Sequence, residues 1–260
     1  MLLSAPVSPG IRRFLLSISG VATAVIAWQI AIAMSPASLI PGPWRVAAGI
    51  VELARSGLLV RYVVASLFRV TWGYVLAVVV AIPAGIALGF RRRGELALNP
   101  ILQLLRPISP LAWIPIAILW FGVGDLSAIF LIFLASFLPL TVATMHAVHN
   151  VDEVHVRAAA NFGLSRRHLL FNVVIPAILP QLLTGMRIAL GIAWVVVVAA
   201  EMIAVNSGLG FLIIDARNAG NRYDLVIAGM ALIGAIGLLL DVLMRRIERF
   251  DAVRWGYTAE

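Results

Sequence analysis

Among the side chains most able to do chemistry are four ionisable groups within otherwise apolar stretches. Arg69, Arg106, Arg187 and Glu201 each fall inside a stretch long enough to cross a bilayer. A charge inside a membrane is costly, so such residues pair with one another or line the path of a solute. A positive group on that path would suit an oxyanion.

Glu201 needs a partner other than Arg187, because the two residues are fourteen positions apart, which is about 21 Å along a helix. We expect Glu201 to pair with a buried arginine such as Arg69, or with helix ends, near the outer end of a solute pathway, where a gate would lie. Glu201 has two alternative roles, as a member of a structural ion pair or as a residue that acts directly in transport or gating. For Arg69 and Arg106 structural roles are favoured. Trp194 lies mid-helix, where it either packs or lines the pathway, and packing is favoured.

The composition excludes several other chemistries. The chain has no cysteine and no lysine, so all 20 basic residues are arginine. Thiolate chemistry, a cysteine metal site, a Walker A phosphate loop and a Schiff base are therefore excluded. His146 and His149 are spaced to share a metal ion, but polar residues are ordinary at a helix end, so we expect no metal and no cofactor. If ATP drives this protein, another chain must bind it.

Apolar stretches predict an all-α integral membrane protein. Hydrophobic residues make up 62% of the chain and charged residues 12%, against roughly 25% charged in soluble domains. A membrane helix needs about 20 apolar residues. The six candidate spans are 14–34, 62–90, 101–121, 127–148, 179–205 and 225–244. Prolines interrupt the third of these, 101–121, and we expect it to be buried in protein instead of facing lipid.

The placement of arginine orients these spans. With the N-terminus in the cytoplasm, twelve arginines lie in inner segments, five in outer segments and three within helices. Cytoplasmic segments carry the excess of arginine, so both termini are expected inside. The expected division is an N-terminal part, 1–60, with a surface helix over 44–58 on the outside; a core, 61–245; and a cytoplasmic tail, 246–260. The segment 206–224 contains an apolar run able to dip back into the membrane.

The polar segment 150–176 predicts a helix–turn–helix on the cytoplasmic side. Acidic residues open its first helix, Gly163 ends it in the left-handed conformation, and Ser165 caps a second helix. Pro176 then admits the next membrane helix near its start. The second arm mixes basic and apolar side chains, which suits docking to a protein groove; a surface helix held by anionic lipid is the alternative. The side chains of this arm are Arg166, Arg167, His168, Leu169, Leu170 and Phe171.

The same segment resembles the cytoplasmic loop of membrane subunits of bacterial ABC importers. That family's pattern is Glu-Ala-Ala, three residues, Gly, nine residues, then Ile-x-Leu-Pro. Ala158, Ala159, Gly163 and Pro176 fit it, whereas Arg157 stands where the family usually has Glu. The stretches 106–124, 185–204 and 207–218 are similar to the nitrate/sulfonate/taurine branch of these permeases.

This resemblance implies a type-I importer fold in the bacterial inner membrane, with no catalytic residue. It implies three kinds of partner: a second permease copy, two cytoplasmic ATPase subunits that hold ATP and Mg²⁺, and an extracytoplasmic binding protein. Residues 165–171 would be the coupling helix in a cleft of the ATPase, with Gly163 permitting the turn. The implied solute is nitrate, taurine, another aliphatic sulfonate or bicarbonate. The alternatives are a self-contained secondary carrier or channel for a small anion, which would more often show internal repeats, and a membrane scaffold.

Overall fold

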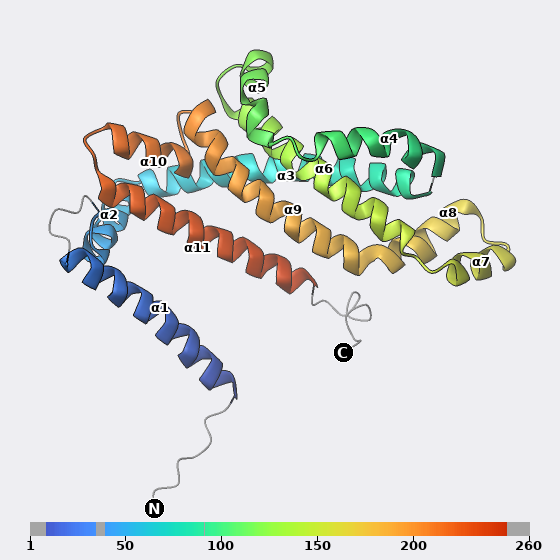
Figure 1. Ribbon diagram of the computed structural model, residues 1–260, viewed down its shortest axis with the longest axis horizontal. Coiled ribbons are helices and arrows are strands. Elements are labelled where there is room, and N and C mark those ends of the chain that lie inside the picture. Colours follow the sequence, from blue (N-terminus) through green and yellow to red (C-terminus); the bar gives the residue numbers. More distant parts are fainter. Residues whose placement is uncertain (1–8, 35–39, 91, 249–260) are drawn as a thin grey trace, which may run out of the picture.

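Long apolar helices form the body of the molecule (Figure 1). The computed structural model describes residues 9–34, 40–90 and 92–248. Among these, four helices are long and apolar enough to cross a membrane, and a bent pair supplies up to a fifth span. The four are α3 (Leu58–Phe90), α6 (Asp125–His149), the continuous helix Arg166–Ala204 that contains α9 (Ile175–Ala204), and α11 (Tyr223–Glu248).

Helix α6 lies between α3 and α9 and forms the centre of the bundle. Its contact with α3 is close because small residues recur every four positions along α3. A Cβ atom at Gly73 would lie 2.7 Å from the Ile132 side chain, and one at Gly85 would lie 2.6 Å from Cβ of Thr144. Small residues at this spacing let membrane helices approach by their backbones, where van der Waals packing holds them together.

Replacing Gly85 with valine is therefore expected to separate α3 from α6. Overpacking a close contact costs roughly 1–3 kcal/mol, so the purified protein should lose several degrees of thermal stability in detergent. The matched control is Gly234→Val in α11, where a Cβ atom would meet nothing within 4 Å. Equal unfolding temperatures for the two variants would contradict the packing argument.

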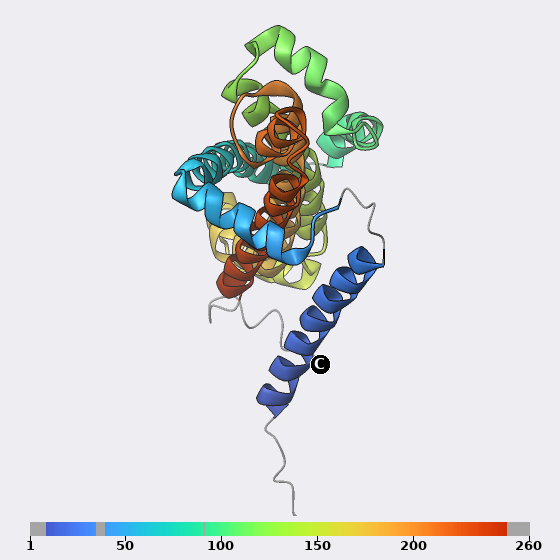
Figure 2. The same ribbon diagram turned by 90° about the vertical axis from the view of Figure 1, so that its left-hand side faces the viewer.

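Two helices precede the bundle. Helix α1 (Pro9–Ala33) stands apart from the bundle along most of its length (Figure 2), and its apolar part, Ser19–Ala33, is shorter than a full span. Helix α2 (Pro43–Arg55) confirms that the segment predicted as a surface helix is helical. It contacts α3 and α11. The predicted tail 246–260 lies outside the described residues from 249 onward.

A surface ion-pair cluster ties α2 to the turn that follows α10 (Leu209–Asn218). Arg222 lies 2.7 Å from Glu52 of α2 and 2.8 Å from Asp224 of α11. The apolar run predicted between the fifth and sixth spans is α10 itself, which contacts both α9 and α11. Its buried residues include Leu209 and Leu212.

The third predicted span is bent, and the single chain leaves most of its second half exposed, so its burial in protein stays a prediction. Helix α4 (Arg92–Leu105) and the segment η1 (Pro110–Trp113) with α5 (Ile114–Phe121) meet at 87°. The bend turns α5 away from the bundle (Figure 1). Leu119 is 81% exposed and Trp120 61%, whereas only Ile114 and Ala117 of α5 are buried.

Candidate functional site

Glu201 and Arg69 form a buried ion pair, as the sequence predicted. Glu201 in α9 has no exposed surface and Arg69 in α3 is 2% exposed, and Arg69 Nη1 lies 2.6 Å from Glu201 Oε1. Neither charge is stable alone in such a place, because removing one partner of a buried pair leaves an uncompensated charge. The pair therefore fixes α3 against α9 at one end of the bundle.

Glu201 also holds the start of α10. The Ser66 hydroxyl and the Gly210 backbone N–H both donate to Glu201 Oε2, each at 2.9 Å, and the Leu209 N–H donates to Ser66 Oγ at 2.9 Å. A carboxylate at a helix N-terminus satisfies backbone N–H groups that lack partners within the helix. A Cβ atom at Gly208 would collide with the Glu201 carboxylate, so this glycine allows the close approach.

Arg69 reaches beyond Glu201 to two further residues. Its Nε donates to Asp125 Oδ1 at 2.8 Å, its Nη1 donates to the Ser207 carbonyl at 2.7 Å, and its Nη2 donates to the Ser207 hydroxyl. Guanidinium offers five N–H donors in a fixed plane. One side chain thus joins α3, α6, α9 and the turn before α10.

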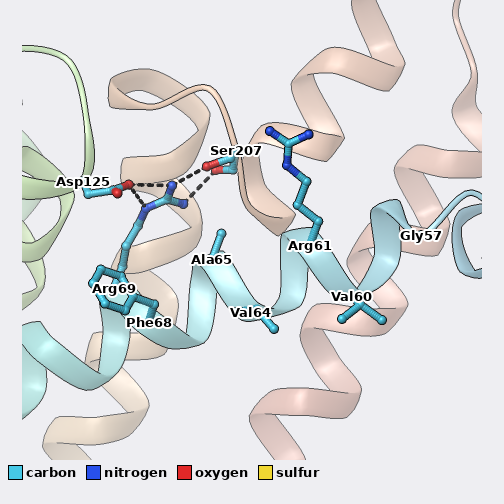
Figure 3. Close-up of a pocket in the computed structure, with 9 residues that line it drawn as sticks. All are labelled: Gly57, Val60, Arg61, Val64, Ala65, Phe68, Arg69, Asp125 and Ser207. Carbon is cyan, nitrogen blue, oxygen red and sulfur yellow. Dashed lines mark hydrogen bonds and ion pairs between the residues drawn. The ribbon is translucent and has the colours of Figure 1, made fainter.

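The network forms one wall of a cavity of about 550 Å³. Figure 3 shows Arg61 and Arg69 two turns apart on α3, with Asp125 and Ser207 facing Arg69. The Asp125 side chain is 55% exposed. The cavity therefore combines an accessible carboxylate, two guanidinium groups and apolar side chains of α3.

The other predicted path residues lie elsewhere. Arg106 is exposed at the bend after α4 and lines no part of this cavity. Trp194 is 7% exposed, and its Nε1 donates to the Ile233 carbonyl at 3.0 Å. It lies against Gly237, so it joins α9 to α11. These contacts match the packing role that the sequence favoured for Trp194.

Four network members were missed from sequence: Ser66, Asp125, Ser207 and Gly208. Ser66 lies three residues before Arg69, on the same face of α3, and this spacing was an available signal. Asp125 resembles any acidic residue at a helix start, and a serine hydroxyl carries no charge. No local pattern distinguishes such residues before the fold brings them together.

The predicted helix–turn–helix lies at the opposite end of the bundle. Helix α7 (Glu153–Asn161) and helix α8 (Arg166–Leu169) are joined by a turn in which Gly163 has φ of 73°. The Ser165 side chain accepts from the His168 N–H, which confirms the predicted cap. Arg157 forms an exposed ion pair with Glu153 one turn earlier.

The second arm divides into an inner and an outer side. Leu169 and Leu170 are half-buried against the ends of α6 and α9, beside Val148 and Val174, so they attach the arm to the bundle. The side chains that face outward are Arg166, Arg167, His168 and Phe171, and Phe162 in the turn is 84% exposed. Only part of the arm predicted as a docking surface is therefore available to a partner.

Helix α9 begins at Ile175, one residue before Pro176, which confirms that Pro176 lies near the start of this helix. A π-helical turn, η2 (Leu170–Val174), joins α8 to α9, and the helix runs from Arg166 to Ala204. Proline has no N–H to donate, and the Ile175 N–H bonds back to the Leu170 carbonyl across the π turn. The second arm of the helix–turn–helix and the spanning helix are thus one continuous element.

A bundle of apolar spans with a buried charge network at one end and a polar helical arm at the other defines a multi-pass membrane protein of the transporter class. Residues 73–250 match the family described as binding-protein-dependent transport system inner membrane component. The chain belongs to this family of ABC importer permease subunits. Members are translocation components that work with an ATPase and a substrate-binding partner.

Several named proteins are similar over most of their length. A putative ABC transporter permease protein of Methanocaldococcus jannaschii is 42% identical, covering 91% of each chain. The taurine transport system permease protein TauC of Escherichia coli is 37% identical, covering 92% of this chain and 89% of that protein. The bicarbonate transport system permease protein CmpB of Synechococcus elongatus is 36% identical, covering 91% and 88%.

The fold is that of a type-I ABC importer permease. A solved structure of the MetNI methionine ABC transporter in an inward-facing conformation matches with a TM-score of 0.66 at 18% identity. The match covers 74% of this chain and 95% of that chain. At this identity the likeness supports the arrangement of helices and not the solute.

Proposed function

We propose that this chain forms half of the path by which a small anionic solute enters the cell, and that a second copy forms the other half. The solute is nitrate, taurine, another aliphatic sulfonate or bicarbonate. The observation that carries the proposal is the similarity, over about nine-tenths of this chain, to permeases named for taurine, aliphatic sulfonates and bicarbonate. All three solutes carry an oxyanion group.

In this proposal the α7–α8 end faces the cytoplasm of the inner membrane. Two ATPase subunits bind ATP and Mg²⁺ there, and the permease supplies no catalytic residue and holds no cofactor. The outward side chains of α8 and the exposed Phe162 dock into the ATPase. The continuous helix from Arg166 to Ala204 carries motion from that end to Glu201, where the extracytoplasmic binding protein delivers the solute.

The assignment of solute is tested by uptake into proteoliposomes that contain the permease, its ATPase and its binding protein. With ATP present, at least one of radiolabelled taurine, nitrate and bicarbonate should accumulate, and omission of the binding protein should abolish uptake. A protein that retains solute-stimulated ATPase activity but takes up none of the three contradicts the anion assignment. Equal uptake without ATP would instead indicate a self-contained carrier.

A further inference from the structure

The two carboxylates that bind Arg69 are held in different ways. Glu201 is completely buried and also accepts hydrogen bonds from Ser66 and Gly210. Asp125 is 55% exposed and meets Arg69 through a single oxygen, Oδ1. A buried carboxylate with several donors cannot leave without great cost, whereas a half-exposed one can turn into water.

Asp125 occupies the edge of Arg69 that faces the cavity. Both Nε and Nη2 of Arg69 lie 2.8 Å from Asp125 Oδ1, so the two nitrogens along this edge share one acceptor oxygen. A planar oxyanion such as nitrate, or a sulfonate group with three oxygens, has more than one acceptor oxygen. It could therefore accept a hydrogen bond from Nε with one oxygen and from Nη2 with another. Such bidentate contacts with guanidinium are the stronger kind.

We propose that this cavity is a binding site for a small monovalent oxyanion, which replaces Asp125 on the Nε–Nη2 edge of Arg69 and takes Arg61 as its second cation. The proposal rests on the proposed function and deepens it, because it names where the permease itself holds the anion. Asp125 then acts as a tethered competitor that returns to Arg69 when the anion moves on.

The charges around the cavity fit an anion that carries a single negative charge. Arg61 and Arg69 contribute two positive charges, and Asp125 and Glu201 balance them in the structure described here. When Asp125 turns into water, one positive charge is left uncompensated beside the cavity. Nitrate, bicarbonate and a sulfonate group each carry the single negative charge that restores the balance.

The cavity has room for such an anion. Its volume of about 550 Å³ lies within the range of roughly 300–1,000 Å³ that is common for ligand sites. Arg61 and Asp125 are both exposed, so water reaches the cavity. Val64 and Phe68 also line it, and Figure 3 places Arg61 one turn from Ala65 and two turns from Arg69.

The test uses the purified complex of permease and ATPase in lipid nanodiscs, without binding protein. Its unfolding temperature is measured against increasing nitrate or ethanesulfonate at constant ionic strength. Bound anion raises that temperature by mass action. Asp125→Asn keeps the size of the side chain but removes the competing charge, and should lower the half-maximal anion concentration by about tenfold or more.

Two further variants make the result decisive. Arg61→Gln changes an exposed side chain and should raise the half-maximal concentration in both the natural and the Asp125→Asn background. Asp215→Asn removes an exposed carboxylate from α10, outside the cavity, and should leave the concentration unchanged. The proposal is overturned if Asp125→Asn behaves like Asp215→Asn, or if Arg61→Gln has no effect.

Failure of this proposal is distinguishable from failure of the proposed function. ATP-driven uptake of an anion, with binding insensitive to Asp125→Asn, overturns the site and leaves the permease function intact. Anion binding that shifts as expected supports the site. If such a complex imports none of the tested anions, the assignment of solute fails alone.

Discussion

Replacing Arg69 with methionine is expected to remove most of the folded permease from the membrane. The change leaves Glu201 charged and buried, and it removes the donors to Asp125 and Ser207. Breaking a buried pair by removing one partner costs roughly 3–5 kcal/mol. The yield of monodisperse protein after detergent extraction, measured by size-exclusion chromatography, should fall severely, and its unfolding temperature should fall with it.

The double variant separates an ion-pair effect from a packing effect. Glu201→Gln in the Arg69→Met background removes the unpaired charge and retains an oxygen for the Gly210 N–H. It should therefore recover part of the stability lost in Arg69→Met. If the double variant is as unstable as the sum of the two single variants, Arg69 and Glu201 are not energetically coupled.

A surface arginine provides the matched control. Arg222→Met removes ion pairs to Glu52 and Asp224, but the Arg222 side chain is 41% exposed. Exposed pairs contribute about 0–1 kcal/mol. Arg222→Met should thus extract and unfold much like the natural protein, and a loss equal to that of Arg69→Met would show that burial does not set the cost.

The Arg69–Glu201 pair was predictable because the cost of a charge in an apolar helix demands a partner. The same reasoning could not identify Asp125, which lies at the start of α6, where acidic residues are ordinary. Nor could it place Ser207, because hydroxyl groups are common in turns, and Ser66 offered only its spacing from Arg69. These residues become a site only when α3, α6 and α9 converge, and that convergence depends on packing between distant segments.

The long spans were predicted from apolar length, whereas their interruptions were not. Prolines near Arg106 signalled a break, but the sequence contains no measure of its angle, and the direction taken by α5 depends on the turn over 106–109. Pro176 was expected near the start of a helix, and α9 begins one residue before it. The sequence did not reveal the π turn before Pro176, which joins α8 and α9 into one longer helix.

The loop at the other end was predictable in more detail, since its signals are local. Gly163 adopts the left-handed conformation that its place between two helices requires, and Ser165 caps the helix that follows. What the sequence could not show is which side chains face outward. Leu169 and Leu170 point toward α6 and α9 because the continuous helix fixes their rotation about its axis.

Replacing Gly163 with proline is expected to uncouple ATP hydrolysis from transport. Proline fixes φ near −65°, and the turn requires 73°, so α8 cannot leave α7 in its present direction. A Cβ atom at Gly163 would meet nothing within 4 Å, so the change should stay local and the bundle should still fold. If the change disfavours the productive position of the arm by about 1.4 kcal/mol, the population in that position falls tenfold. ATP-driven uptake should then fall by about the same factor.

Gly163→Asn is the control that isolates the backbone conformation. Asparagine tolerates positive φ far better than other residues with a side chain, so this variant should retain most uptake although it also adds a side chain at the turn. Both variants are compared in proteoliposomes with the ATPase and the binding protein, by uptake and by solute-stimulated ATPase activity. Natural levels of both activities in Gly163→Pro would exclude α7–α8 as the coupling element. Loss of both activities in Gly163→Asn as well would mean that the turn contacts the ATPase directly through its surface, and that its conformation is not what transmits the motion.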